Sequence, residues 1–139
     1  MSQLQQHLNQ LLAAIGTGQT MEHIMRAAET AAGRRVVLPG DEAWLPASDW
    51  HHSNVVSIDG NTVRLIAIWA LNPGHGAFRK LIAGIEAAGL QPCIVEPTSE
   101  MRATLTRWGW KGKRHGYGFN GEERWHPRKT LNANARTAA

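Results

Sequence analysis

The chain has 139 residues, of which 42% are hydrophobic and 19% charged, a composition typical of a globular domain and not of a disordered chain. The single cysteine, Cys93, excludes an internal disulfide and a zinc site built from several cysteines. The net charge is +4, and without a cationic leader or a long apolar run we expect a cytoplasmic protein with no membrane span.

Two amphipathic helices are expected at the start of a single domain over residues 1–129. Apolar residues between Leu4 and Ile15 recur at helical spacing, and a second helix is expected from Thr20 to Gly33. A short strand over residues 35–38 should follow. The last ten residues, 130–139, are expected to form a flexible tail.

The middle of the chain predicts a β-hairpin. Two apolar runs, residues 54–58 and 62–71, flank Asp59-Gly60, and an Asp-Gly pair between such runs is a strong hairpin signal. The second run is long and mostly apolar, so we expect it to be a central strand of the sheet.

A glycine turn follows this strand. Its sequence is Asn72-Pro73-Gly74-His75-Gly76, and helical spacing then resumes at Phe78 and continues to Gly89. Free main-chain N–H groups at a helix N-terminus suit phosphate oxygens, and glycine lets a ligand approach closely. A tight turn that needs positive φ would use the same residues, so the turn alone leaves both interpretations open.

The remaining elements predict how the sheet is completed. We expect a strand over residues 90–95, a helix that begins at Pro97-Thr98 and ends at Gly109, and a closing hairpin of residues 113–119 and 122–125. This order is not the doubly wound alternation. It predicts an α/β (α+β) fold with a central, mostly antiparallel mixed sheet flanked by helices.

The strand, turn and helix resemble the defining stretch of the GNAT-type N-acetyltransferase superfamily, a long strand followed by Q/R-x-x-G-x-G/A and a helix. Residues 96–110 are similar to the family's later segment N-x-x-A-x-x-F-Y-x-x-x-G-F, with Gly109-Trp110 in place of Gly-Phe. The resemblance covers about Val55 to Trp125. It implies a GNAT-like domain that transfers an acetyl group from acetyl-CoA, as co-substrate, to an unknown amine.

Two alignments of the turn with the family motif are open. With Gly74 and Gly76 as the motif glycines, the leading Gln or Arg falls on Leu71. A shift of two residues places Gly76 and Phe78 at the two motif glycine positions and Pro73 at the Gln or Arg position, and it aligns the helix leucines better. The resemblance implies that the coenzyme binds at Ala70, Leu71, Gly74, His75, Gly76, Ala77, Phe78, Arg79 and Lys80.

The residues for proton transfer depart from the family. Its tyrosine, which protonates the departing thiolate, falls on Leu105, so we expect Tyr117 from the last hairpin to act instead, with Thr104 or Thr106 as weaker substitutes. Glu96 is the best-placed carboxylate to accept a proton from the amine, although a carboxylate before a helix is also favoured by the helix dipole. His51 and His52 are a second choice.

Two other functions fit the sequence. Residues 102–129 carry eight basic and two acidic side chains interleaved with aromatic rings, as in proteins that bind single-stranded nucleic acid. A catalytically silent GNAT-fold structural protein, of the kind found among bacteriophage products, is the other alternative. The seven histidines show no metal-binding spacing with carboxylates, and the oligomeric state is not encoded in any visible pattern.

Overall fold

The computed structural model describes Gln5, residues 20–116 and residues 121–127. The expected helix at residues 4–15, the tail at 130–139 and Tyr117 lie outside these residues. In chain order the elements are α2 (Met21–Ala31), β1 (Arg35–Val37), β2 (Val55–Asp59), β3 (Thr62–Ala67), α3 (Ala77–Ala87), β4 (Gln91–Val95), α4 (Ser99–Arg107), β5 (Lys111–His115) and β6 (Glu122–His126).

The strands form one six-stranded mixed sheet in the order β1-β2-β3-β4-β6-β5. Only β3 and β4 run parallel, because α3 carries the chain back between them, and all the other neighbours are antiparallel. This arrangement confirms the expected α/β class with a mostly antiparallel central sheet. It also places β3 in the middle of the sheet, as its apolar sequence predicted.

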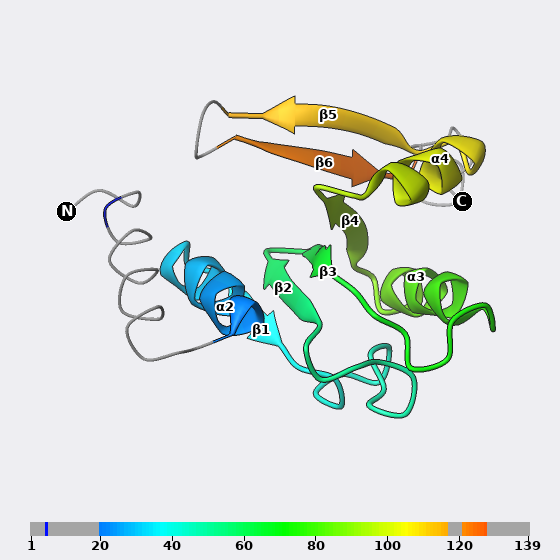
Figure 1. Cartoon of the computed structure of the whole chain (residues 1–139), viewed down its shortest axis with the longest axis horizontal. Coiled ribbons are helices and arrows are strands. Elements are labelled where there is room, and N and C mark those ends of the chain that lie inside the picture. Colours follow the sequence, from blue (N-terminus) through cyan, green and yellow to red (C-terminus); the bar gives the residue numbers. More distant parts are fainter. Residues whose placement is uncertain (1–4, 6–19, 117–120, 128–139) are drawn as a thin grey trace.

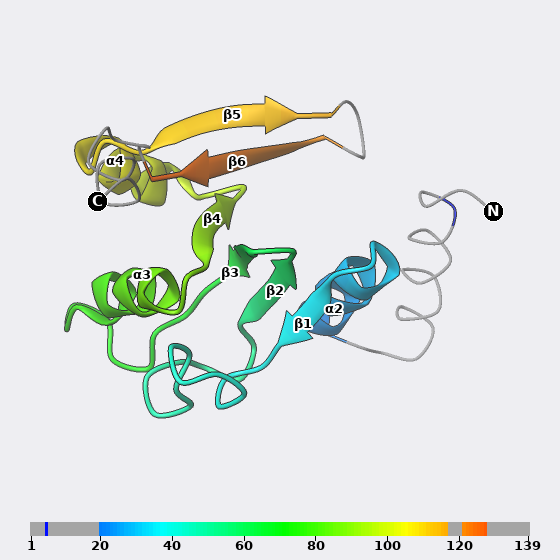
Figure 2. The ribbon, with the colours of Figure 1, turned by 180° about the vertical axis from the view of Figure 1, so that it is seen from behind.

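The helices cover both faces of the sheet (Figures 1 and 2): α2 lies beside β1 and β2, while α3 and α4 lie on the other side. Side chains alternate between these faces along β3. Leu65 belongs to the apolar core with Leu81 and Ile85 of α3, whereas the buried Arg64 meets Glu29 of α2. The core is therefore apolar toward α3 and ionic toward α2.

Local signals in the sequence explain α3 and α4. Helix α3 begins after Gly76, which has φ 77°, and buries Leu81, Ile82 and Ile85 at helical spacing. Helix α4 begins after Thr98, whose Oγ1 accepts a hydrogen bond from the Met101 N–H at 3.2 Å. Both helices start where the sequence predicted.

Strand β3 is shorter than expected, because it ends at Ala67 and not at Leu71. Val55 pairs with Ala67 and Val56 with Leu65, so Ile66 forms a bulge without a partner on β2. The Oδ1 atom of Asn54 then accepts a hydrogen bond from the N–H of Trp69 at 2.6 Å. A single bridge between Trp50 and Ala70 continues the pairing.

None of the helices within residues 20–116 and 121–127 has the length and apolar content needed to cross a bilayer.

Candidate functional site

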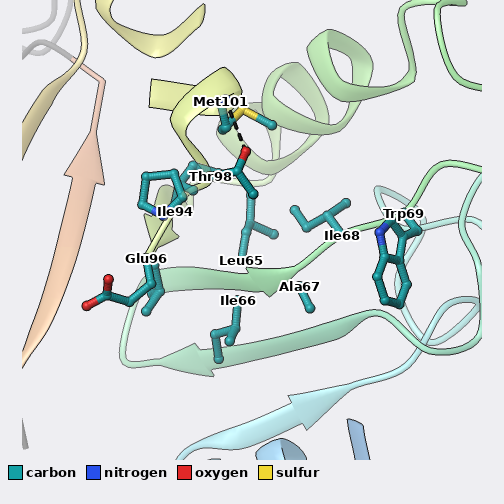
Figure 3. A pocket seen from close by; sticks show the side chains of 11 residues that line it. Leu65, Ile66, Ala67, Ile68, Trp69, Ile94, Glu96, Thr98 and Met101 are labelled. Carbon is teal, nitrogen blue, oxygen red and sulfur yellow. Dashed lines mark hydrogen bonds between the residues drawn. The ribbon is translucent and has the colours of Figure 1, made fainter. Parts of the chain in front are cut away.

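The two parallel strands separate toward their carboxyl ends. Their pairing runs from Thr62–Gln91 to Leu65–Ile94 and then stops. Beyond it, the bulge redirects β3, whereas β4 pairs with β6 at Val95. A cavity of about 370 Å³ lies between the diverging ends (Figure 3).

This first cavity, the gap cavity, has mostly apolar walls. Leu65 and Ile68 point toward α4, while Ile66 and Ala67 point to the opposite side (Figure 3). Neither the N–H nor the C=O of Ile68 hydrogen-bonds within the part of the chain that the structure describes. The bulge therefore leaves main-chain polar groups available to a ligand in the gap.

A second cavity of about 510 Å³, the turn cavity, shares Ile68 and Met101 with the gap cavity. It extends from the gap to the glycine turn and to one side of α4. The residues that line it are Trp50, Ile68, Ala70, Pro73, Gly74, Gly76, Ala77, Phe78, Arg79, Met101, Thr104 and Trp108.

The glycine turn presents free main-chain N–H groups. From Gly74 to Arg79, no N–H donates a hydrogen bond to another described residue, and the first paired amide is that of Lys80, 3.1 Å from the Gly76 carbonyl. Gly74 and Gly76 have φ 84° and 77°, in the left-handed region that favours glycine. The N-terminus of α3, with its partial positive charge, thus faces the turn cavity.

A cation and two rings form one wall of the turn cavity. The Arg79 guanidinium carbon lies 4.4 Å from the centre of the Trp108 ring, and Phe78 stacks on the same ring at 5.4 Å. The cation–π contact holds the Arg79 charge beside the free amides without a carboxylate partner among the described residues.

The structure brings together six of the nine residues expected at the coenzyme: Ala70, Gly74, Gly76, Ala77, Phe78 and Arg79 line the turn cavity. The other three do not line it. Leu71 is 52% exposed, and its N–H donates a hydrogen bond to the Asp49 carbonyl. The Lys80 Nζ lies 3.5 Å from Asp49, and His75 is exposed on the turn.

Glu96 lies at the gap, but its carboxylate is directed outward. The residue follows β4 with φ 48°, an uncommon value for a residue other than glycine. Its Oε1 accepts the N–H of Glu123 at 2.8 Å and lies 3.6 Å from Arg114. Figure 3 shows this side chain pointing away from Ile68 and Trp69.

The position aligned with the family's tyrosine is part of the core. Leu105 is fully buried, so its side chain faces the sheet and not the cavities. Thr104 lines the turn cavity, and its Oγ1 donates to the Glu100 carbonyl at 3.2 Å. The Oγ1 of Thr106 donates to the Arg102 carbonyl.

The face of the sheet toward α2 holds a buried ionic network that sequence reasoning missed. Arg64, 3% exposed, donates through Nε to Glu29 at 2.8 Å and through two nitrogens to Glu122 at 2.6 and 2.9 Å. Ser57 and Arg34 also donate to Glu29. Arg64 thereby connects α2 and β6 to the central strand.

The network shifts the pKa values of its members. Burial opposes the charged form of Glu122, but hydrogen bonds from Arg64 and Arg124 outweigh it and lower the pKa of Glu122 to about 2. Burial also opposes the charge of Arg64, yet its two carboxylate partners raise its pKa. Burial raises the pKa of the neighbouring Cys93 thiol to about 11.

Ion pairs neutralise much of the positive charge in the late basic segment. Arg102 pairs with Glu123, Arg114 with Glu96 and Arg124 with Glu122. Only part of the charge that suggested a nucleic-acid partner is therefore free on this surface.

Among the described residues no group of three or more His, Cys, Asp or Glu side chains could hold a metal ion. Comparison with protein-family models, with curated proteins and with solved structures found no match to this chain.

Trp108, Met101 and Ile68 are among the cavity residues that sequence reasoning did not assign to the site. Met101 and Trp108 follow helical spacing, a pattern that by itself indicates core packing, and both do pack against the core. Arg79 lies in the first turn of a helix that follows a glycine turn. A cation at that place was the one sequence signal for an aromatic partner nearby.

Proposed function

We propose that this protein binds acetyl-CoA, with the pyrophosphate at the N-terminus of α3, and transfers the acetyl group to an amine. The observation that carries the proposal is the row of unpaired amides from Gly74 to Arg79, which opens on a cavity adjoining the gap between β3 and β4. Backbone N–H groups at a helix N-terminus favour bound phosphate.

The topology supports the resemblance on which this proposal rests. A single parallel pair, joined through α3 and separating at its carboxyl end, gives a groove that a thioester arm could enter. Helix α3 begins directly after Gly76, and Leu81 and Ile82 are buried, which favours the alignment with Gly76 as the first motif glycine.

The residues of the site have distinct tasks in this proposal. The amides and Arg79 bind the phosphates, the apolar walls of the two cavities exclude water, and the N–H of Ile68 orients a carbonyl in the gap. The coenzyme supplies a thioester: the amine nitrogen bonds to its acyl carbon, the C–S bond breaks, and the proton lost by nitrogen is gained by sulfur.

Two groups are proposed to carry protons. Glu96, at the edge of the gap, takes the proton of the ammonium through an intervening water, because its carboxylate is directed away from the cavity. Tyr117, which follows β5 in the sequence and lies outside the described residues, is proposed to return a proton to the thiolate. Glu96→Gln and Tyr117→Phe should each slow transfer while acetyl-CoA binding stays within about twofold.

Calorimetry with acetyl-CoA tests the binding proposal. We expect a dissociation constant below about 100 μM, equivalent to about 5.5 kcal/mol. Absence of binding at millimolar acetyl-CoA would overturn the proposal. Binding without release of CoA thiol in the presence of any amine from a broad panel would instead favour the catalytically silent alternative.

A further inference from the structure

A third cavity is lined by His51, whose ring contacts Trp69 at the wall of the gap cavity. Its volume is about 480 Å³, and we call it the arginine cavity because Arg26 of α2 lines it. His51 and His52 supply its other polar side chains. Leu38, Trp50 and Leu71 are apolar walls, and Leu38 and Leu71 are 43% and 52% exposed.

Arg26 forms no salt bridge within residues 20–116 and 121–127, and the nearest acid on its own helix, Glu22, interacts with its charge only at longer range. Its Nη2 donates to the carbonyls of His52 and Asn54 at 2.5 and 2.7 Å, which fixes the guanidinium in place. Its Nε is buried and has no hydrogen-bond partner among the described residues. A guanidinium fixed by carbonyls alone keeps its full charge for an anion.

The carboxylates near the walls of this cavity are engaged elsewhere. Glu42 pairs with Arg35, Asp49 lies beside Lys80, and Asp41 accepts the N–H of Leu38 at 2.9 Å. Glu22, one turn before Arg26 on α2, makes no ion pair with it. None of these acids therefore occupies the place of a ligand anion.

The two histidines add donors to the same cavity. The Nδ1 of His51 accepts the Ser53 N–H at 3.2 Å, so the proton of a neutral ring lies on Nε2. The rings of His51 and His52 lie 4.2 Å apart. Arg26 and the two histidines are the polar side chains of an otherwise apolar lining.

The arginine cavity adjoins the proposed transfer site. The edge of the His51 ring meets Trp69 at 6.4 Å between centroids, and Trp69, 61% exposed, also lines the gap cavity. Trp50 lines both the arginine cavity and the turn cavity. The His51 and Trp69 rings thus link the arginine cavity to the gap cavity, and Trp50 links it to the turn cavity.

We propose that the arginine cavity binds the carboxylate end of the acceptor, and that the acceptor is an amine carrying a carboxylate on an apolar or aromatic body. The charge of Arg26 selects the anion, and the walls around Trp50 select the apolar body. Assignment of this ligand as the acceptor depends on the proposed acetyl transfer, whereas binding of the carboxylate itself does not.

Benzoate is the probe for the carboxylate, because it has an aromatic body and no amine. In an NMR titration of the full chain without coenzyme, we expect millimolar binding that shifts the His51, His52 and Trp50 side-chain signals. Leu71→Glu, at an exposed position, adds a negative charge to the cavity without touching the Arg26 contacts, and should weaken benzoate at least tenfold. Leu71→Gln is its neutral control and should stay within about threefold.

Arg26→Gln should also abolish benzoate binding, and its melting temperature shows whether this variant is still folded. Arg79→Gln, in the turn cavity, should leave benzoate unchanged. Inorganic phosphate that binds more tightly than benzoate would overturn the choice of a carboxylate. Equal benzoate affinity of Leu71→Glu and the natural protein would show that benzoate does not bind in the arginine cavity.

The acceptor assignment is tested by comparing phenylalanine with 2-phenylethylamine, which lacks the carboxylate. We expect phenylalanine to be at least tenfold better in kcat/KM, and this preference to disappear in Leu71→Glu. Benzoate binding without acetyl-CoA binding would reject the proposed function and support carboxylate binding in the arginine cavity. Acetyl-CoA binding without benzoate binding would reject only this inference.

Discussion

Arg79 and Lys80 are adjacent cations in the first turn of α3, but they lie in different surroundings. Arg79 lies on Trp108 beside the free amides, whereas Lys80 lies beside Asp49. Cations are unfavourable at a helix N-terminus, so a charge held there by an aromatic ring points to an anionic ligand. The two residues form a matched pair for testing which charge the ligand meets.

Arg79→Gln should weaken acetyl-CoA binding about tenfold, because it removes a charge that is held next to the amides proposed to bind phosphate. Lys80→Gln should change the dissociation constant less than about twofold. Calorimetry at two salt concentrations checks both variants. An equal loss in the two variants would show only a general effect of net charge and contradict the assigned role of Arg79.

The packing of α3 against the loop that holds Trp44 depends on Gly84, a glycine in the interior of the helix. A Cβ added at Gly84 would lie 2.9 Å from the Trp44 Cβ and 3.4 Å from its Cα. Trp44 is buried, and its main chain cannot yield as a flexible side chain would. The close approach of helix and loop fixes the helix that carries the free amides.

Gly84→Ala should therefore lower the free energy of unfolding by about 1–3 kcal/mol, although alanine is the better helix former by about 1 kcal/mol. Denaturant unfolding measures the change. Ala83→Gly, on the exposed side of the same helix, is the control and should cost about 1 kcal/mol through helix propensity alone. A Gly84→Ala variant as stable as the natural protein would refute the close packing.

Elements with strong local signals could be predicted from the sequence. Helices α3 and α4 begin at a glycine turn and a capping threonine, and both hairpins have Asp-Gly or Asn-Gly between their strands. The end of β3 could not be predicted, because the apolar residues before and after Ile66 look alike in sequence. The bulge there depends on the register with β2, which no local pattern encodes.

The site was predicted in part for the same reason. The turn residues follow one another in the chain, so a motif shows them. Glu29 and Arg64 are 35 residues apart, and Arg26 and Asn54 are 28 apart, so these contacts depend on how α2 packs against the sheet. Each looks in sequence like an ordinary surface charge on a helix or strand.

At the scale of the whole molecule, Arg64 connects the two halves of the sheet across β4. Its partners are Glu29 on α2 and Glu122 on β6. Strand β4 lies between β3 and β6 in the sheet, and its pairing with β6 is limited to two residue pairs. The ion pairs thus add to a short ladder at the place where the sheet opens for the gap cavity.

This connection predicts a loss of stability in acid. The pKa of Glu122 is about 2 in the folded chain, below its ordinary 4.5, so its contribution is complete above pH 4.5 and is lost as the pH falls toward 2. Glu122→Gln should cost about 1–3 kcal/mol at pH 7, allowing for partial exposure, and should flatten the stability profile between pH 4.5 and 2.

Thermal unfolding as a function of pH measures both effects. Glu123→Gln is the control, because Glu123 is the next residue and pairs with Arg102 at the surface. It should lose less stability than Glu122→Gln at pH 7. The prediction fails if the two variants have the same profile, since the buried pair would then contribute no more than the surface pair.

The seclusion of Cys93 has a practical consequence for assays. It is the only cysteine of the chain, it is 1% exposed, and its pKa is raised to about 11 by burial, so almost none of it is thiolate at neutral pH. A disulfide reagent that detects liberated coenzyme thiol would meet no competing sulfur while the protein stays folded. The same reagent would report the opening of β4 when unfolding begins, so one colour change could follow both turnover and denaturation.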